Sequence, residues 1–573
     1  MLAGLAIAIA GTPVLAQYAA GVDISAGQSQ ADGAQPQDAE PVWTGPAADP
    51  ALLKDLVIAI RASASHGLNP QNYHLAQLEA VNVLRFDPAT DDLARRAYLS
   101  LAGDLLAGRF DPVRFEPDWT APRRARDLPA YLHQAMADNR VAGSLEALAP
   151  DEPGYTALRN ALPRYQAIAE AGGWPAIDAG PELQSGDRGP RVAQLRARLE
   201  ASGELAPLAI PAAAEDQAVR NTDPVTPDPA SPEPASPEPA DPEFFDPALQ
   251  AAVETFQRSA RLDVDGRVGS QTLRELNLGA DYRASQIRAN LERYRWLPAD
   301  MGRRHIRVNI PDFSLEARNE GVVERRHDAI VGLTWRPTPV FSADMTYIVV
   351  NPWWETPASI AVRNELPLFR ADPGAVTRLG FQVLDRDGNP VDPATIDWNT
   401  VPERDFPYRL RQAPGPLNAL GEVKLIFPNP HNVYLHDTSN RDLFANNRRC
   451  FSSGCVRLRD PFELADWVIA ETPQLTPEGL REIAAGNTET RLPLARPIPV
   501  YVLYWTAVHD PSTGIRFVAD LYQRDDELIS ALEATPPPVE ERYEKISRPS
   551  RVECRPGVCL APDRARQAFQ SGY

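Results

Sequence analysis

The pattern of apolar residues changes near Asn290, and this change constrains the fold more than any other feature of the chain. Before it, apolar residues recur at helical spacing, as over 192–199 and 249–256. After it, short runs of β-branched and aromatic residues alternate with turns, as over 347–350 and 423–427. Helical blocks followed by a block of strands are typical of chains with several domains, so the sequence predicts a multidomain α+β fold.

The length of 573 residues suggests three or four domains at about 150 residues each. We predict a helical scaffold domain over 46–180, a small three-helix module over 181–280 and a mostly β domain over 300–530. A C-terminal tail would follow over 535–573.

A Pro-rich acidic stretch over 211–243 interrupts the three-helix module. It repeats the unit Ala-Ser-Pro-Glu-Pro and contains no Lys or Arg after Arg220. Such a sequence buries too little apolar area to offset the entropy of ordering. We therefore predict an extended, disordered insert without a catalytic role.

The first residues have the features of an export signal. Leu2 to Ala16 is an apolar stretch of signal-peptide length, with small residues at the positions that precede a cleavage site. No Lys or Arg precedes it, which departs from the usual pattern. We predict a signal peptide over 1–16 and an exported protein. No second apolar run approaches the roughly 20 residues of a spanning helix, so we do not expect an integral membrane protein.

Charge narrows the range of partners. The formal net charge is −19 and the isoelectric point is about 5.0. Nucleic-acid binding requires clustered Lys and Arg that replace condensed counterions, and the sequence has no such cluster. We therefore expect no nucleic-acid partner.

The strongest chemical signal is a histidine and a cysteine, His436 and Cys455, which lie 455 − 436 = 19 positions apart. A strand-like run over 432–435 delivers the histidine, and a Ser-Ser-Gly turn delivers the cysteine. A free thiol has a pKa of about 8.5, so a nucleophilic cysteine needs an imidazole or another positive field. The pair predicts a cysteine nucleophile with a histidine base.

A metal site is a different use of the same residue types. His431, His436, Cys450 and Cys455 could bind zinc, but neither Cys-x2-Cys nor His-x3-His spacing is present. On a strand, two histidines 436 − 431 = 5 positions apart would face opposite ways. We therefore expect no metal and no cofactor.

Four cysteines in an exported protein raise the question of disulfides. Cys554 and Cys559 can close a small loop across a Pro-Gly turn. Cys450 has the same spacing from Cys455, so it is either a free neighbour or a partner that locks the site by oxidation. Four cysteines permit three pairings, and the sequence does not choose among them.

Several motifs occur together in this chain: His436, the run from Ser452 to Arg457, the segment from Arg411 to Pro416, and the Trp-containing segment from Asn351 to Pro357. This set resembles the large L,D-transpeptidases of Gram-negative periplasms over about residues 50 to 530. The broader family commonly has His-Gly-Cys where this chain has Ser-Gly-Cys, a variation that the large subgroup shares. The three-helix module, with its Phe-Gln pair at 256–257, is similar to a peptidoglycan-binding-like module.

The resemblance implies a reaction and a compartment, the periplasm. In it Cys455 attacks the amide between the third and fourth residues of a peptidoglycan tetrapeptide stem, releases D-alanine and forms a thioester. The diaminopimelate amine of a second stem then accepts the acyl group in a 3→3 cross-link. His436 serves as the base, and carbapenems would acylate the same thiol.

The remaining site residues are expectations of the same kind. Asp437 adjoins the histidine but faces the other side of a strand, so a backbone carbonyl is better placed to orient the imidazole. Backbone N–H groups at Gly454 and Cys455 would form an oxyanion hole. The expected substrate-binding residues are Arg457, Tyr434, Trp354 and Ser453.

A long segment over about 355–420 separates two strands of the β domain. It exceeds the length that a connection needs, so we predict a lid subdomain over the cysteine that opens to admit stem peptides.

Other functions stay open on the sequence alone. With water as acceptor the same thiol chemistry makes an L,D-carboxypeptidase, and with a protein amine it attaches an envelope protein to the wall. A catalytically inert wall-binding protein is the non-enzyme alternative. The oligomeric state is not encoded in any pattern that we recognise.

Overall fold

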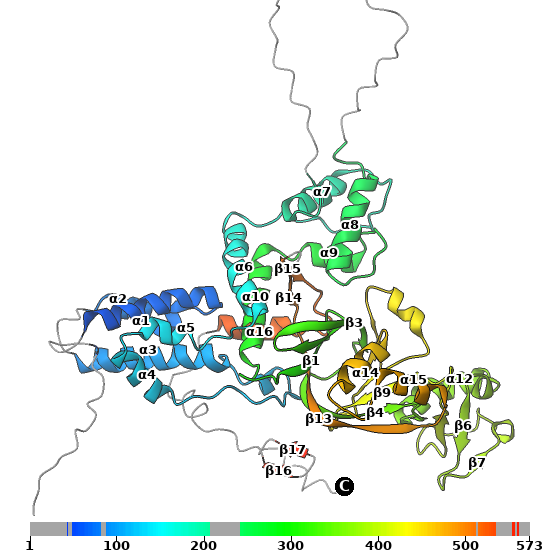
Figure 1. Ribbon diagram of the computed structural model, residues 1–573. Coiled ribbons are helices and arrows are strands. Elements are labelled where there is room, and N and C mark those ends of the chain that lie inside the picture. Colours follow the sequence, from blue (N-terminus) through cyan, green and yellow to red (C-terminus); the bar gives the residue numbers. More distant parts are fainter. Residues whose placement is uncertain are drawn as a thin grey trace, which may run out of the picture. The chain divides into compact units, whose positions relative to one another are not determined.

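The computed structural model describes residues 43, 49–81, 87–206, 241–511, 514–534, 553–555 and 558–560. They form a multidomain α+β fold, as the sequence predicts (Figure 1). The expected signal peptide over 1–16 lies outside the described residues, and so do residues 211–240 of the expected Pro-rich insert. None of the described helices is long and apolar enough to cross a membrane.

The N-terminal part of the described chain is helical. Asp49, Asp87 and Asp127 each cap a helix by accepting a hydrogen bond from a first-turn N–H, and a proline lies in each first turn. All residues from Tyr98 to Ala107 of the central helix are buried. The helices are α1 (Pro50–Ala62), α2 (Leu75–Glu79), α3 (Pro88–Ala107), α4 (Leu128–Ala137), α5 (Val141–Glu146) and α6 (Pro153–Glu170), with 3-10 turns η1 (Ser63–His66), η2 (Pro70–Tyr73) and η3 (Pro112–Arg114).

The next part is a small module of helices α7 (Pro190–Ser202), α8 (Pro247–Ser259) and α9 (Ser270–Leu276). Asp246 caps α8, where its Oδ1 accepts from Leu249 N at 2.7 Å. The buried Gln257 amide donates to Asp265 Oδ1 at 2.8 Å and to Arg267 O at 2.9 Å, so α8 fixes the Gly-rich turn before α9. Helix α10 (Ala280–Arg295) then packs against α6 and α16 (Asp525–Glu533).

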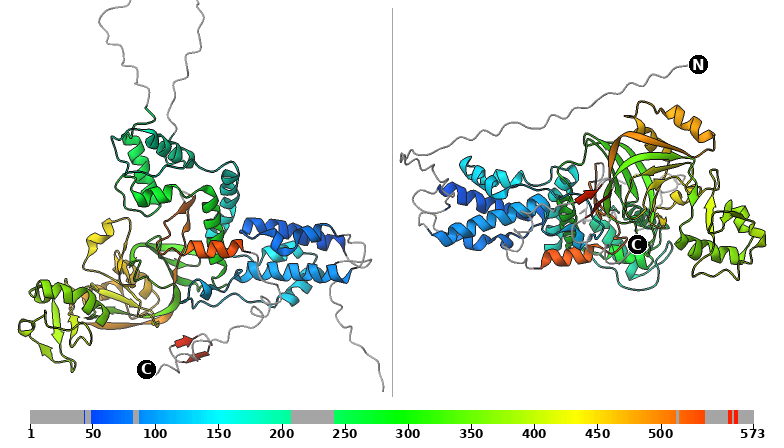
Figure 2. Two further views of the ribbon diagram at one scale, coloured as in Figure 1. Left: turned by 180° about the vertical axis from the view of Figure 1, so that it is seen from behind. Right: turned by 90° about the horizontal axis from the view of Figure 1, so that it is seen from below.

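A nine-stranded sheet in the order β11-β3-β12-β10-β9-β4-β13-β1-β2 makes up the β domain. The first part of β3 also pairs with β2, so the sheet curls round and closes on itself (Figure 2). The strands are β1 (Arg304–Asn309), β2 (Ser314–Asn319), β3 (Val322–Gly332), β4 (Phe341–Val350), β9 (Val423–Ile426), β10 (Leu435–His436), β11 (Cys450–Ser452), β12 (Val456–Leu458) and β13 (Thr490–Leu503).

The inner face of this sheet and helix α14 (Pro461–Ile469) share one apolar core, and helix α15 (Pro477–Ala485) packs at its side. The residues Asp460 and Pro461 before α14 are typical of a helix start and predict a side-chain cap by Asp460. That prediction is wrong, because Asp460 has a left-handed backbone (φ +52°) and its side chain makes no cap hydrogen bond. The short 3-10 turn η6 (Arg441–Ala445) precedes β11.

The C-terminal hairpin also differs from expectation. The strand-like runs at 500–505 and 515–521, separated by the turn-type residues 510–514, predict a hairpin from sequence alone. In the structure, however, 500–503 belongs to β13, which lies between β4 and β1. The hairpin is made instead by β14 (Ala507–Asp510) and β15 (Gly514–Phe517). Strand β13 already pairs with β4 on one side and β1 on the other, so no side is left for residues 515–521. The strand that follows it, β14, pairs with β15 instead.

The segment predicted as a lid folds into a subdomain with its own core. A four-stranded sheet in the order β5-β8-β6-β7 packs on short helices through buried residues that include Leu366, Phe369 and Trp398. Its elements are β5 (Trp354–Glu355), α11 (Ala358–Ile360), the π-helix η4 (Ala361–Glu365), α12 (Leu366–Ala371), α13 (Ala375–Arg378), β6 (Phe381–Leu384), β7 (Pro390–Val391), η5 (Pro393–Thr395) and β8 (Arg409–Gln412).

Within 535–573 the structure describes two short strands, β16 (Glu553–Arg555) and β17 (Val558–Leu560). Cys554 and Cys559 are register partners on them. Their side chains lie outside the described part of the chain, so the bridge between them stays a prediction.

Candidate active site

Two adjacent parallel strands place the predicted nucleophile and base on one face of the sheet. β10 and β12 pair with His436 opposite Arg457, and Val456 N donates to Tyr434 O at 3.1 Å. Side chains alternate along a strand and paired residues point the same way, so Tyr434, His436, Cys455 and Arg457 share one face of the sheet.

A lysine that the sequence analysis missed lies on the same face. Lys424 of β9 is the register partner of His436. Its Nζ lies 3.8 Å from the centre of the Tyr434 ring, and that ring meets the His436 imidazole edge-on at 5.5 Å. Alternation within 423–427 places Lys424 on the face opposite Val423 and Leu425, but only the strand register shows that this face carries the histidine.

The turn before Cys455 is held by hydrogen bonds on both sides. Gly454 has a φ of +117°, and its N–H donates to Ser452 Oγ at 3.1 Å. Its carbonyl accepts from Thr338 Oγ1 at 2.9 Å. We expected the backbone N–H groups of Gly454 and Cys455 to form an oxyanion hole. The Gly454 N–H already donates to Ser452. The Cys455 N–H has no hydrogen-bond acceptor within the described residues. Ser453 is exposed, and its Oγ accepts from Arg336 Nη1 at 2.9 Å.

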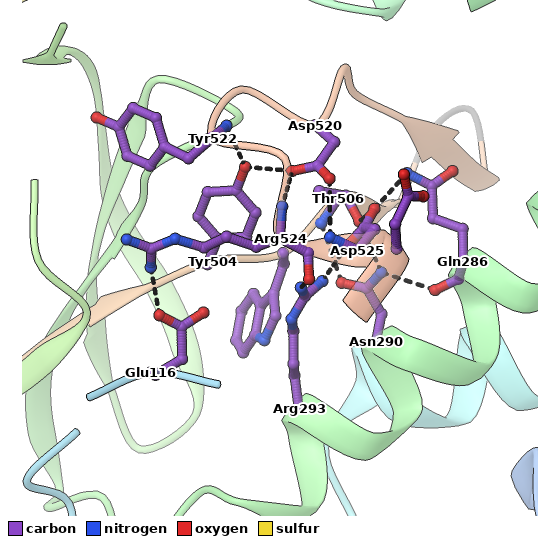
Figure 3. A network of polar contacts seen from close by, with 12 residues as sticks. Glu116, Gln286, Asn290, Arg293, Tyr504, Thr506, Asp520, Tyr522, Arg524 and Asp525 are labelled. Atoms are coloured by element: carbon purple, nitrogen blue, oxygen red, sulfur yellow. Dashed lines mark hydrogen bonds and ion pairs between the residues drawn. The ribbon is translucent and has the colours of Figure 1, made fainter. Parts of the chain in front are cut away.

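A buried polar network supports this turn from behind. The Tyr522 hydroxyl accepts from Thr338 N at 3.1 Å and donates to Gly332 O at 2.7 Å. Figure 3 shows how Tyr522 continues through Tyr504 and Asp520 to the region of helix α10, with Tyr522 N donating to Tyr504 Oη at 2.7 Å. The cysteine turn is thus connected to the packing of α10.

Burial dominates the acidity of the nucleophile. The pKa of the Cys455 thiol is raised by burial, although hydrogen bonding by Tyr434 and the positive charges of Lys424 and Arg457 act to lower it. The sulfur lies 3.6 Å from Asn432 O. Cys455 keeps partial exposure, so a reagent can reach the thiol even though protein surrounds most of the sulfur.

His436 is only 4% exposed, and burial, Arg457 and Lys424 lower its pKa to about 3. Its Nδ1 is buried and has no hydrogen-bond partner among the described residues. The imidazole is therefore neutral at pH 7. Because the thiol is neutral too, the resting pair is not a thiolate-imidazolium ion pair.

Asp437 is held on the other side of the strand. Its carboxylate accepts from Glu422 N at 3.0 Å and from Arg441 Nη2 at 3.0 Å. It lines a separate cavity of about 450 Å³ together with Arg441 and Arg459. This carboxylate is therefore not positioned by these contacts to orient the imidazole.

The expected binding residues fall in two places. Arg457 is half-buried on the Cys455 face, and its Nε has no hydrogen-bond partner within the described chain. Trp354 lies in strand β5 of the lid, where its ring packs 5.9 Å from that of Phe381. Trp354 is thus part of the lid structure, whereas Tyr434 and Arg457 surround the cysteine.

Cys450 is not a partner for Cys455 in this fold. β11 and β12 flank β3 on opposite sides, with Cys450 opposite Val331 and Arg457 opposite Ile330. Two strand spacings therefore separate the Cα atoms of Cys450 and Cys455 by about 10 Å. A disulfide spans at most roughly 7 Å between Cα atoms. Both cysteines are free, which favours the first of the two alternatives for Cys450, a free neighbour of the site. Among the described residues no group of three or more His, Cys, Asp and Glu is arranged to hold a metal ion.

Three segments of the chain match protein-family models. Residues 303–483 match the L,D-transpeptidase catalytic domain, 235–276 match a “Putative peptidoglycan binding domain”, and 35–162 match a “Scaffold domain”. These matches confirm the resemblance to L,D-transpeptidases with a peptidoglycan-binding module.

One curated relative matches part of the chain. A protein of Haemophilus influenzae described as “Putative L,D-transpeptidase” is 38% identical over 200 residues, which are 35% of this chain and 40% of that protein. The chain therefore spans less than half the length of this curated relative.

Solved structures are more distant. An L,D-transpeptidase from Xylanimonas cellulosilytica is 15% identical, with 57% of this chain and 99% of that chain covered at a TM-score of 0.16. L,D-transpeptidase 3 from Mycobacterium tuberculosis is 12% identical, with 35% and 61% covered at a TM-score of 0.18. At such TM-scores the solved structures carry no argument for this chain.

Proposed function

We propose that this chain, whose residues 303–483 are an L,D-transpeptidase catalytic domain, forms 3→3 peptidoglycan cross-links through a cysteine thioester. The observation that carries the proposal is the register of β10 and β12, which puts His436 on the same face of the sheet as Cys455, the residue directly before β12. The peptidoglycan-binding-type segment would hold the wall while the thiol reacts.

The first half of the reaction transfers the acyl group to sulfur. The Cys455 sulfur attacks the carbonyl between the third and fourth residues of a donor stem, and the thiol proton passes to His436 as the bond forms. The imidazole is unprotonated in the resting enzyme because its pKa is lowered to about 3, which also makes it a weak base. The proton therefore moves only as the carbon–sulfur bond forms, because bond formation makes the S–H group strongly acidic. The carbon–nitrogen bond then breaks, His436 returns the proton to the leaving D-alanine amine, and the thioester remains.

Charge develops on the carbonyl oxygen and on the sulfur in this step. The N–H of Cys455 is the proposed oxyanion donor, because that of Gly454 donates to Ser452. Lys424 and Arg457 favour the sulfur anion, and both act against the burial that raises the thiol pKa. In this proposal their positive charges stabilise the transition state more than the neutral resting thiol.

The second half returns the enzyme to its starting state. The diaminopimelate amine of a second stem attacks the thioester carbonyl and gives up one proton to His436. The carbon–sulfur bond breaks, and the sulfur takes that proton back as the new amide is released. Water in place of the amine would give a carboxypeptidase, and a protein amine would attach that protein to the wall.

Mass spectrometry of muropeptides tests the proposal. We expect the wild-type chain, incubated with tetrapeptide-containing peptidoglycan, to give a protein thioester adduct and a 3→3 dimer, and Cys455→Ala to give neither. Cys450→Ala is the matched control, because Cys450 lies on the far side of β3. A wild type that forms no adduct with either stem peptide or carbapenem would identify an inert wall-binding protein.

The proposed opening of the lid has its own test. Residues 371–405 include β6 and β7, and β6 supplies Phe381 and Val383 to the lid core. Deletion of this stretch should therefore disrupt the lid while the nine-stranded sheet keeps its strands. Full cross-linking activity after the deletion would exclude a role of the lid in substrate handling.

We propose an exported, wall-associated location for the protein, in line with a domain that acts on peptidoglycan. The assignment to the periplasm and the signal peptide over 1–16 remain predictions from the sequence.

A further inference from the structure

The backbone of the cysteine turn is fixed from two sides. On one side, the Ser452 hydroxyl accepts from Gly454 N at 3.1 Å and donates to the Cys455 carbonyl. The peptide group between these two contacts consists of the Gly454 carbonyl and the Cys455 N–H. Thr338 holds that group from the other side, because its Oγ1 donates to Gly454 O at 2.9 Å.

The Thr338 hydroxyl has a defined position and direction. Its oxygen accepts from Gly332 N at 2.9 Å, so its single proton is directed to Gly454 O. Thr338 is fully buried, and water therefore does not compete for this proton. The backbone of Thr338 is fixed as well, because its N–H donates to Tyr522 Oη at 3.1 Å and that hydroxyl donates to Gly332 O at 2.7 Å.

The bond from Thr338 also sets the direction of the Cys455 N–H. A trans peptide group is planar, so its C=O and N–H point in opposite directions, and the Cys455 N–H points away from the buried Thr338. Gly454, at a φ of +117°, restrains this plane little, because a residue without Cβ rotates about its backbone bonds at low cost. Among the described residues, the bond from Thr338 is the hydrogen bond that holds this peptide group.

We propose that Thr338 is a positioning residue, which acts through the Gly454 carbonyl to aim the Cys455 N–H at the oxygen that becomes negative during acyl transfer. The inference rests on the proposed function, which makes this N–H the oxyanion donor. Thr338 touches no substrate atom in this role. Its hydrogen bond holds the donor in place before the reaction, so the N–H does not have to turn toward the charge as that charge develops. The same bond polarises the peptide group and strengthens its N–H as a donor.

Two reactions of the same sulfur in the full chain test this role. Acyl transfer from a tetrapeptide stem forms an oxyanion, whereas alkylation by iodoacetamide displaces iodide from a tetrahedral carbon and forms none. Thr338→Val removes the hydroxyl and keeps nearly the same shape. We expect kcat for D-alanine release to fall by about 10- to 100-fold with KM within about twofold. The rate and pH dependence of Cys455 alkylation should stay unchanged, because Tyr434, Lys424 and Arg457, which shift the thiol pKa, remain in place.

Two further variants separate positioning from a general loss of stability. Thr338→Ser keeps the hydroxyl and should recover most of kcat. Ser144→Ala is the matched control, because its buried hydroxyl also has two partners, Val141 O at 2.7 Å and Tyr98 Oη at 2.8 Å, but lies among the scaffold helices. It should leave kcat unchanged. An unchanged kcat in Thr338→Val would overturn the proposal, and so would an equal fall in acyl transfer and alkylation or a serine variant as slow as the valine variant.

A second measurement does not depend on catalysis. Labelling the four cysteines with ¹⁵N gives four backbone amide signals in NMR, and Cys455→Ala identifies that of Cys455. We expect Thr338→Val to shift or broaden this signal and Thr338→Ser to restore it, because the amide senses the hydrogen bond to the carbonyl of its own peptide group. An unchanged signal in Thr338→Val would overturn the proposal. A wild type that forms no thioester would reject the proposed function, and the amide signals would then still decide whether Thr338 holds the peptide group.

Discussion

Charged groups are buried in two regions of this molecule, and they are treated in opposite ways. Around helix α10, Arg293 donates to Asp525 at 2.5 Å and Arg295 to Glu292 at 2.8 Å (Figure 3 shows the first pair). On the Cys455 face, Lys424 and Arg457 are half-buried without an ion pair among the described residues. Pairing fixes a structure, whereas unpaired charge in a partly open site leaves electrostatic energy for a ligand or a transition state.

Two histidines show the same difference at the level of single atoms. His66 is 2% exposed, with Nδ1 at 2.8 Å from Tyr155 Oη and Nε2 at 3.2 Å from Glu146 Oε2. His436 is equally buried, but its Nδ1 has no partner in the described part of the chain. A satisfied imidazole belongs to the packing of the scaffold, and an unsatisfied one is available for proton transfer.

The largest effect should come from the unpaired histidine. His436→Asn removes the proposed base, so we expect D-alanine release to fall by about 10²- to 10⁴-fold. The free energy of unfolding should change by less than about 1 kcal/mol, because no ring hydrogen bond of Nδ1 is lost. Steady-state kinetics and urea unfolding of the same preparation check both parts. A variant that loses stability in proportion to activity would remove the distinction between the two histidines.

The paired region should respond in stability. Asp525→Ala leaves Arg293 buried without its carboxylate and removes the acceptor of Thr506 Oγ1 at 2.7 Å. We expect the free energy of unfolding to fall by about 3–5 kcal/mol. Urea unfolding measures it, and Asp526→Ala, an acidic neighbour in the first turn of α16, is the control. Equal stability of the two variants would contradict the role given to pairing.

A smaller effect should follow from one site charge. Lys424→Met removes a positive charge that lowers the Cys455 pKa, so that pKa should rise further. Alkylation of Cys455 by iodoacetamide at pH 8 should slow by roughly threefold to tenfold. The pH dependence of the alkylation rate gives the shift directly. Arg491→Met, which removes a cation stacked on Tyr347 rather than on Tyr434, should leave the rate unchanged.

The smallest effect concerns pH and stability. Burial first, then Arg159, lowers the pKa of His66 to about 4 in the folded chain. The unfolded chain binds the proton first, since an unperturbed histidine has a pKa of about 6.5, so His66 favours unfolding as the pH falls from 6.5 toward 4. We expect its contribution to cost about 1 kcal/mol between pH 7 and pH 5.5. The difference in the pH slope of unfolding between wild type and His66→Gln measures it, and parallel slopes would contradict the expectation.

Sequence reasoning worked where local chemistry decides the outcome. The alternation at 423–427 predicts a strand, and the structure contains one over Val423–Ile426. Asp246 and Pro247 are likewise residue types that start a helix, and α8 begins there. That His436 and Cys455 act together was inferred from their chemistry, and their position on one face of the sheet depends on the register between β10 and β12. Register depends on the whole closed sheet, which is why Lys424 was missed.

The failures have the same origin. Asp460 has the residue type of a cap, yet the chain enters α14 with a left-handed residue that takes the side chain away from the first-turn N–H groups. The pairing of Cys450 with Cys455 looked feasible from spacing along the chain, but the insertion of β3 between their strands separates them.

The closure of the nine-stranded sheet also bears on solubility. An open sheet ends in unpaired backbone groups that can recruit a strand from another molecule and start aggregation. Here β2 is paired on both sides, and within the described chain the three-residue β11 is the strand of this sheet that has a single neighbour. So short an edge is a poor template for a further strand, so two molecules that collide are not expected to join through their nine-stranded sheets.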